Sequence, residues 1–337
     1  MNKKIFYTIF CCLALIIVLV LFALRSQNDF SDVKRTQNAI TDAASLPEAK
    51  PMPIVDLNDG DTYEMTAEAV KKTIGNREIR MLAYNGSIPG PLIRAPKWAE
   101  ITLKFTNNID VPTTIHSHGV RLANEFDGVP DVTQKEIKSG ESFTYKIKFP
   151  DEGVYWYHPH IREDYAQELG MYGNYVVMPD DPNYYSPVNR TEYLFLDDLY
   201  LENGQTPFDK DIATHALMGR FGNVMLVNGE TDYTLRVNKS DVVRFVFTNS
   251  ANTRVFNVWI TDAQMKLVGG DNGKYERETF VDSVLLWPSE RAIVDVYFSD
   301  KGEYTLIHST PDKTYELGSI FAENTEKEIS FVKAFQT

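Results

Sequence analysis

Apolar residues in this chain alternate with polar residues over short runs, and turn-forming residues separate one run from the next. Alternation with a period of two predicts β-strands that bury one face. Gly, Pro, Asn and Asp stand between the runs, and short strands separated by such turns are typical of a Greek-key β-sandwich. The strands predicted in the first half of the chain span residues 63–72, 78–84, 99–106, 113–118, 142–149, 153–158 and 173–178.

The second half of the chain repeats the first half. The tripeptide Phe105–Asn107 recurs as Phe247–Asn249, an offset of 142 residues, and a later block recurs at an offset of 149 residues. Self-similarity at this period predicts two copies of one domain fold. We therefore expect an all-β chain with two consecutive Greek-key sandwich domains, at residues 51–182 and 183–337, joined at the turn-rich segment Pro179–Pro182.

The start of the chain departs from this pattern and predicts a membrane segment. Lys3 and Lys4 precede an apolar run of twenty residues, Ile5–Leu24, which is long enough to cross a bilayer as a helix. The lysines place the N-terminus in the cytoplasm and the rest of the chain outside. We expect residues 1–25 to be a single-pass anchor, with a cleaved signal peptide as the alternative, and residues 26–50 to be a flexible polar tether.

Charge and cysteine content narrow the classes of partner and chemistry. The net charge is −13, and no basic cluster occurs beyond the first few residues, which argues against a nucleic-acid partner. Both cysteines, Cys11 and Cys12, lie in the apolar run. The expected extracytoplasmic part of this sequence therefore offers no disulfide, no thiolate metal ligand and no cysteine nucleophile.

Four of the six histidines form two His-x-His doublets, His116 with His118 and His158 with His160. Residues i and i+2 of a strand project from the same face, so each doublet presents two imidazoles in one direction. Two such strands side by side would form a four-imidazole face, which suits a late first-row transition metal. We interpret the other two histidines, His215 and His308, as structural.

The repeat provides an internal control for this interpretation. At offsets of 142 and 149 residues, the four histidines fall on Val258, Ile260, Ile307 and Ser309. The second copy thus keeps the scaffold without the imidazoles. Packing of the domain does not require them, and we expect them to serve chemistry in the first copy alone.

These motifs together resemble the multicopper oxidases, the laccase and copper-efflux-oxidase group built from cupredoxin domains. The resemblance covers residues 50–335, as the first two domains of the three-domain type, and it implies two cupredoxin-like domains. The segments that carry it are His116–Gly119, Asp127–Pro130, Trp156–His160, Tyr84–Pro91 and Leu169–Val177.

The resemblance also implies roles for individual residues. In this family the first doublet gives one ligand to the type 2 copper and one to the type 3 pair, and the second doublet gives two ligands to the pair. His116 would then bind type 2 copper, and His118, His158 and His160 would bind type 3 copper. Asp127 matches an acidic residue near the type 2 copper that helps proton delivery in efflux-type members, while an ordinary Asp-Gly turn remains the alternative.

The family's type 1 copper and the other four trinuclear ligands belong to a third domain, whose motifs do not occur in this sequence. We therefore expect a third cupredoxin domain as partner, in cis or as a separate chain. The implied function is an exported oxidoreductase that couples one-electron oxidation of a small substrate, a phenol or Cu⁺, to the reduction of O₂ to water. This chain alone is expected to be inactive.

Other functions remain open at this point. A membrane-tethered copper carrier would use the same four imidazoles, and the sequence leaves that alternative standing. A structural pseudo-oxidase is disfavoured because degenerate members lose these histidines first. A zinc hydrolase is the weakest alternative, since no open three-ligand set of the kind such enzymes use occurs.

Overall fold

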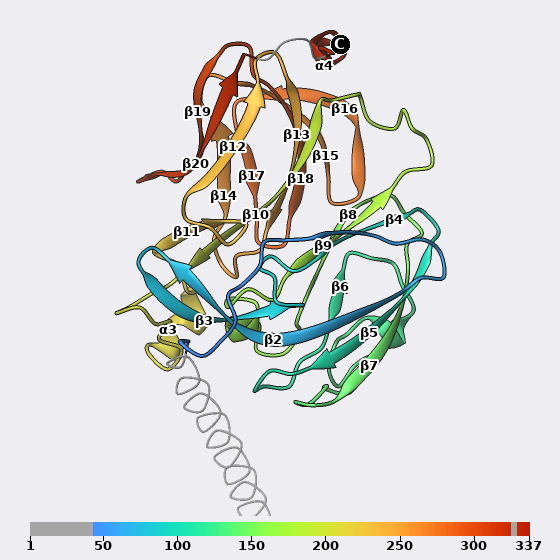
Figure 1. The fold of residues 1–337 in the computed structure, drawn as a ribbon, viewed down its shortest axis with the longest axis vertical. Helices are drawn as coiled ribbons and strands as arrows, with labels where there is room; N and C mark the ends of the chain where they lie inside the picture. The colour runs from blue at the N-terminus through green and yellow to red at the C-terminus, as the bar shows by residue number, and fades with distance from the viewer. Residues whose placement is uncertain (1–42, 325–328) are drawn as a thin grey trace, which may run out of the picture.

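The computed structural model describes residues 43–324 and 329–337, and strands dominate it (Figure 1). No helix in this described part of the chain is both long enough and apolar enough to span a bilayer. The anchor expected at residues 1–25 and the first part of the tether, residues 26–42, lie outside the described residues. Both therefore stay predictions.

The first half of the chain folds into two sheets that face each other. One sheet has the order β3-β2-β5-β7 and the other β1-β4-β9-β8-β6. Two short helices, η1 (Asn124–Phe126) and α2 (Glu163–Ala166), lie in the connections. The strands are β1 (Ile54–Asp56), β2 (Thr62–Ile74), β3 (Arg77–Tyr84), β4 (Leu92–Pro96), β5 (Glu100–Asn107), β6 (His116–His118), β7 (Ser142–Lys148), β8 (Gly153–His158) and β9 (Gly173–Met178).

The second half folds in the same way, with the sheets β11-β10-β13-β18-β15-β16 and β12-β20-β19-β14-β17. Its helices are α3 (Ile212–Met218) and α4 (Val332–Gln336). The strands are β10 (Arg190–Leu199), β11 (Val224–Val227), β12 (Tyr233–Asn238), β13 (Val242–Asn249), β14 (Phe256–Ile260), β15 (Gln264–Gly270), β16 (Gly273–Val281), β17 (Val284–Leu286), β18 (Arg291–Tyr297), β19 (Gly302–Ser309) and β20 (Thr314–Glu323).

Strand pairing confirms the repeat and the all-β fold. In the first half β2 pairs in parallel with β5, which pairs antiparallel with β7. In the second half β10 pairs in parallel with β13, which pairs antiparallel with β18. Most strands of the two halves lie toward opposite ends of the long axis of the molecule, while α3 of the second half lies at the end with the first half (Figure 1).

Six of the seven predicted strands match observed strands to within two residues at each end, and β1 and β4 were not predicted. The segment predicted at 113–118 is a strand only over His116–His118. Thr113 forms an isolated bridge with Ile137 instead, through backbone hydrogen bonds in both directions. The predicted length was therefore wrong, because a connection rather than a ladder takes up the backbone groups of Thr113. His215 lies in α3.

The core explains why β8 lies where it does. In β5 buried side chains alternate with more exposed ones, as expected for a strand with one covered face. Every residue of β8 is buried. Tyr155 and Tyr157 pack into the core of the first half, while Val154 packs against Val246 and Ile293 of the second half. The strand that ends at His158 thus lies where the two halves meet.

Candidate metal centre

The two histidine doublets come together through a single antiparallel ladder. β6 pairs with β8 so that His116 lies opposite His158 and His118 lies opposite Trp156. His116 and His118 project from the same face of β6 because residues i and i+2 of a strand point in the same direction. His160 follows the end of β8, and its ring centroid lies 5.3 Å from that of His116.

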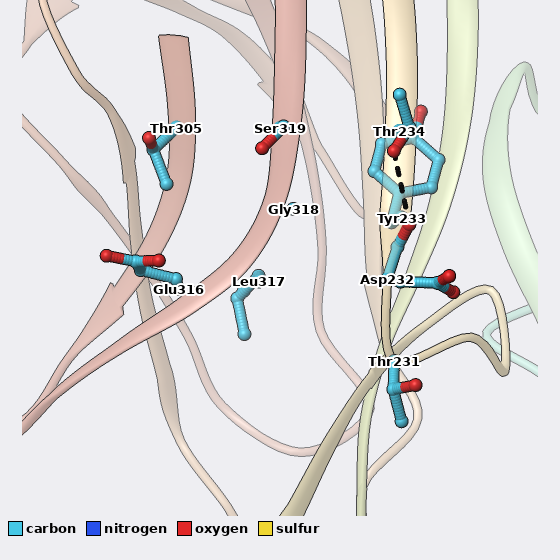
Figure 2. Close-up of a pocket in the computed structure, with 9 residues that line it drawn as sticks. All are labelled: Thr231, Asp232, Tyr233, Thr234, Thr305, Glu316, Leu317, Gly318 and Ser319. Carbon is cyan, nitrogen blue, oxygen red and sulfur yellow. Dashed lines mark hydrogen bonds between the residues drawn. The ribbon is translucent and has the colours of Figure 1, made fainter. Parts of the chain in front are cut away.

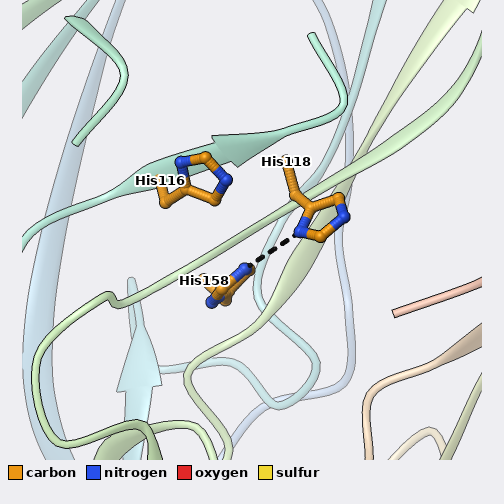
Figure 3. A group of neighbouring side chains, drawn as sticks. All are labelled: His116, His118 and His158. Carbon is orange, nitrogen blue, oxygen red and sulfur yellow. Dashed lines mark hydrogen bonds between the residues drawn. The ribbon is translucent and has the colours of Figure 1, made fainter. Parts of the chain in front are cut away.

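Three of the imidazoles form a compact cluster (Figure 3). His116, His118 and His158 each offer one nitrogen atom, and these atoms lie within 4.8 Å of one another. Nε2 of His158 lies 3.5 Å from Nδ1 of His118. By ring centroids, His160 lies 6.2 Å from His158 and 5.3 Å from His116. The structure therefore brings all four predicted residues to one place, with three of them closest.

Neighbouring oxygen atoms decide which nitrogen of each ring faces the cluster. Nδ1 of His116 donates to the carbonyl oxygen of Asp127 at 2.6 Å, and Nδ1 of His158 donates to that of Pro159 at 2.8 Å. A carbonyl oxygen can only accept, so in both rings Nε2 keeps its lone pair. Nδ1 of His160 lies 3.3 Å from a carboxylate oxygen of Glu163, which leaves Nε2 of this ring for a metal.

Burial keeps the imidazoles of His118 and His158 neutral. Burial, with His116 as the next cause, lowers the pKa of His158 well below its usual value. Burial, followed by the charge of Arg291, lowers the pKa of His118 to about 4. A histidine must be unprotonated at the nitrogen that binds a metal ion. The donor set, its tautomers and its protonation therefore all fit a bound transition metal.

Aromatic packing fixes the position of the central ring. The ring of Trp156 stacks on that of His158, with a centroid distance of 4.2 Å and an angle of 26° between the planes. Trp156 itself is fully buried and packs with Tyr172 and Phe195. The indole thus restricts rotation of the imidazole, and little rearrangement is needed for metal binding.

Both halves of the chain line the pocket in front of the imidazoles. It has a volume of about 260 Å³. The first half contributes the four histidines with Glu163 and Gln167, and the second half contributes Ala251, Asn252, Pro288 and Ser289. Sequence reasoning missed the last six residues. Glu163 lies only three positions after His160, a proximity visible in the sequence, whereas the four residues of the second half reach the pocket only through packing of the two halves.

Asp127 lies beside the first doublet. Its carbonyl oxygen holds His116, and its carboxylate oxygen lies 3.5 Å from the same Nδ1 atom. Gly128 follows at φ +78°, so close to β6 that a Cβ atom would overlap the carbonyl oxygen of Ile115. Asp127 thus belongs to a turn that packs on the histidine strand, and it also places a carboxylate there.

A second pocket, of about 240 Å³, is lined by residues at β12, β19 and β20 (Figure 2). Its polar side chains include Asp232, Glu316 and Thr305, and no histidine lines it. The hydroxyl of Thr234 donates to the carbonyl oxygen of Asp232 at 3.2 Å. Among the described residues, the only group of His, Cys, Asp and Glu arranged to hold a metal ion is the histidine cluster.

Comparison with known proteins places both halves in one family. Residues 64–182 match one family model described as multicopper oxidase, and residues 191–326 match a second model with the same description. Together the two matches cover most of the chain.

The curated relatives are about twice as long as the matched part of this chain. Multicopper oxidase MmcO of Mycobacterium tuberculosis is 29% identical over 260 residues, which cover 68% of this chain and 50% of the relative. Copper resistance protein A of Escherichia coli is 24% identical over 316 residues, covering 80% and 51%. The chain thus spans about half the length of the curated relatives it matches.

Solved structures share the fold. A multicopper oxidase from Pseudomonas thermotolerans superposes with a TM-score of 0.72 at 28% identity, covering 81% of this chain and 65% of that one. A blue copper oxidase from Nitrosomonas europaea gives a TM-score of 0.68 at 24% identity, covering 78% and 86%. At the latter identity the likeness concerns the fold alone.

Proposed function

This chain belongs to the multicopper oxidase family, and on that premise we propose that it is the copper-binding part of an exported oxidase that couples substrate oxidation to reduction of O₂ to water. The single observation that carries the proposal is the histidine cluster, in which nitrogens of His116, His118 and His158 lie within 4.8 Å of one another. Imidazole ligands suit copper, which is the metal of this family.

The ligand assignment follows from which nitrogen of each ring is left to face the cluster. His116 would hold the type 2 copper through Nε2, and His118 would contribute Nδ1 to the type 3 pair. His158 and His160 would contribute Nε2 to the same pair. When bound, copper supplies the electron transfer between the reducing substrate and O₂. The chain's own residues would hold the rings. Trp156 orients His158, and burial keeps His118 and His158 neutral.

Asp127 is proposed to deliver protons to this site. Its carboxylate lies 3.5 Å from Nδ1 of His116, and its side chain is 35% exposed. It can therefore exchange protons with solvent while it remains next to the first doublet. Reduction of O₂ to water consumes protons, so a carboxylate in this position can supply them to the pocket.

A third cupredoxin domain, in cis or as a separate chain, is the proposed partner. The trinuclear site of this family takes eight imidazoles, and the two domains proposed at residues 51–182 and 183–337 provide four. The remaining ligands and the type 1 site that accepts electrons from a small reductant would come from that domain. Lys3, Lys4 and the run Ile5–Leu24 would tether the assembly on the extracytoplasmic side of the cytoplasmic membrane.

A copper carrier is the second candidate function. The observation that favours it is the pocket itself, which opens to the surface and offers copper four imidazoles. The carrier and the oxidase differ in their chemistry with O₂, because a carrier binds and releases copper without consuming O₂.

Copper binding with ligand variants tests the proposal. The purified full-length chain, freed of metal by a chelator and then titrated with copper, should bind copper. The double variant His158→Ala/His160→Ala should lose most of it, while His215→Ala, which removes a histidine from α3, should not. Full copper retention in the double variant would overturn the site. O₂ consumption after addition of a third cupredoxin domain that carries the missing motifs would support the oxidase over the carrier.

A further inference from the structure

The strand that carries the first doublet is short and lies at the edge of its sheet. β6 has three residues and pairs with β8 alone among the strands of its sheet. At its N-terminal side the backbone N–H of Ile115 donates to the hydroxyl of Tyr145 at 2.9 Å. The strand ends at His118 on the other side. A short edge strand frays easily at its ends, so a ligand in this position needs further support.

Arg291, at the start of β18 in the second half, packs against the end of the β6–β8 ladder at which His118 lies. Its side chain is 2% exposed, and its Nε atom donates to the carbonyl oxygen of Val154 in β8 at 3.1 Å. Gly119 follows His118 at φ +82°, and a Cβ atom there would lie 3.2 Å from Nη2 of Arg291. Because His118 pairs with Trp156, Val154 and Gly119 lie at the same end of the β6–β8 ladder.

The same guanidinium also holds the facing wall of the pocket. Its Nη1 atom donates to the carbonyl oxygen of Ser289, and Ser289 lines the histidine pocket. Asp271 completes the arrangement. Its carboxylate lies 3.2 Å from Nε of Arg291 and accepts the backbone N–H of Arg291 at 2.8 Å. One side chain therefore hydrogen-bonds to β8 and to Ser289 of the pocket wall, and it lies against Gly119, the residue after His118.

The repeated fold does not require an arginine at this position. Arg291 pairs with Thr248 in the β13–β18 ladder, and the equivalent ladder of the first half pairs Thr106 with Ser142. Ser142 is exposed and shares a hydrogen bond of 2.9 Å with Thr106. Burial of a charged group costs free energy that only good partners offset. A buried guanidinium found at this position in one half only points to a local role beside the pocket.

We propose that Arg291 is a positioning residue for the copper pocket. It holds the end of β6, and with it His118, at a fixed distance from His158 and from the Ser289 wall. The planar guanidinium contacts Val154 and Ser289 at once, and the single ammonium group of lysine has no such fork. The inference rests on the proposed function, since it concerns the geometry of the same copper ligands.

Copper affinity and the electron paramagnetic resonance spectrum of the copper-loaded full-length chain test this role. Arg291→Lys and Arg291→Met should bind Cu²⁺ roughly tenfold more weakly, as for other residues that orient metal ligands. Both should also change the copper hyperfine splitting, because His118 moves relative to His158. A residue that only stabilises the fold would change neither the affinity nor the splitting.

Arg244 provides the matched control. It is also buried, pairs with Asp295 at 2.7 Å and donates to the carbonyl oxygen of Ser186. None of these residues lines the histidine pocket. Arg244→Lys should lower the free energy of unfolding and leave the copper affinity and the spectrum as in the wild type.

The outcomes separate this inference from the proposed function. Wild-type affinity and spectrum in Arg291→Lys, together with loss of copper in His158→Ala/His160→Ala, would overturn the role of Arg291 and leave the site intact. Copper retention in that double variant would overturn the site itself. Should Arg291→Met fail to fold, the lysine variant decides alone, because it keeps the charge and loses only the fork.

Discussion

Nε2 of His158 lies 3.5 Å from Nδ1 of His118, although 40 positions separate the two residues in the chain. At this distance one of the two nitrogens can donate a hydrogen bond to the other. Nδ1 of His158 donates to Pro159, which leaves the shared proton of the metal-free protein on His118. A metal ion can replace that proton, and this exchange makes the pair a ready metal site.

Colour distinguishes this copper site from a type 1 site. The copper-loaded chain should show no intense blue absorption, because that band requires a Cu–thiolate bond and both cysteines lie within residues 1–25. Visible spectroscopy of the loaded chain checks this, with the weak absorption of Cu²⁺ bound by imidazoles as the expected result. An intense blue band would contradict the assignment of four imidazoles as the ligands.

Gly128→Ala should destabilise the turn that packs on β6. An L-residue at φ +78° costs roughly 1–2 kcal/mol, and the added Cβ would in addition overlap the carbonyl oxygen of Ile115. Gly60→Ala is the control, since Gly60 has φ +84° and no atom lies within 4 Å of its Cβ position. Urea unfolding should show a larger loss for Gly128→Ala than for Gly60→Ala. Equal losses would contradict the close packing of the turn on the histidine strand.

His308 should make the stability of the second half depend on pH. The ring is buried, and its Nδ1 accepts the backbone N–H of Asn257 at 3.1 Å. Burial lowers its pKa below the usual value. As pH falls below about 6.5, the unfolded chain therefore takes up a proton before the folded protein does. The free energy of unfolding should be largest above this pH and should fall toward the lowered pKa.

The variant His308→Gln isolates this effect, because glutamine can still accept the hydrogen bond from Asn257 but does not titrate. Urea unfolding of the metal-free proteins between about pH 7.5 and about pH 5.5 compares the two slopes. His118 and His158 contribute a slope of the same sign to both proteins, so the difference belongs to His308. Equal slopes would show that His308 titrates alike in the folded and unfolded states.

The sequence predicted the parts of this site that depend on local periodicity. The spacing of His116 and His118 alone predicted that both rings lie on one face. The absence of imidazoles at the equivalent positions Val258 and Ile260 indicated that packing of the domain does not require them. The start of β6 was not predictable, because Thr113 pairs with Ile137 and a bridge of this kind leaves no pattern in its neighbours.

The wall of the pocket was beyond the reach of sequence patterns for a different reason. Asn252 and Ser289 line it only because the two halves pack together around β8. Arg291 is the clearest case. The equivalent position in the first half is the exposed Ser142. The repeat therefore gives no indication that the guanidinium of Arg291 contacts β8.

Asp127→Asn should separate copper binding from proton delivery. The carbonyl oxygen of residue 127, rather than its carboxylate, is the close partner of His116, so the copper affinity should stay within error of the wild type. In an assembly completed by a third domain, the rate of O₂ consumption should fall by about 100-fold, the lower end of the effect of a general acid. An oxygen electrode and a copper titration on the same preparations check both parts. An unchanged rate would leave Asp127 with the role of a turn residue.

The copper-loaded chain without a further domain should show no oxidase turnover with a phenolic dye or with Cu⁺. Four imidazoles leave each copper ion without part of its ligand shell, and the described residues offer no thiolate through which a donor could pass electrons. The measurement is O₂ consumption by the loaded chain against free copper at the same concentration. Addition of a third cupredoxin domain with the missing His and Cys motifs should start consumption, and His116→Ala should then stop it. Turnover by the loaded chain above the free-copper control would show that electrons reach O₂ without a type 1 site, and it would remove the need for a partner domain.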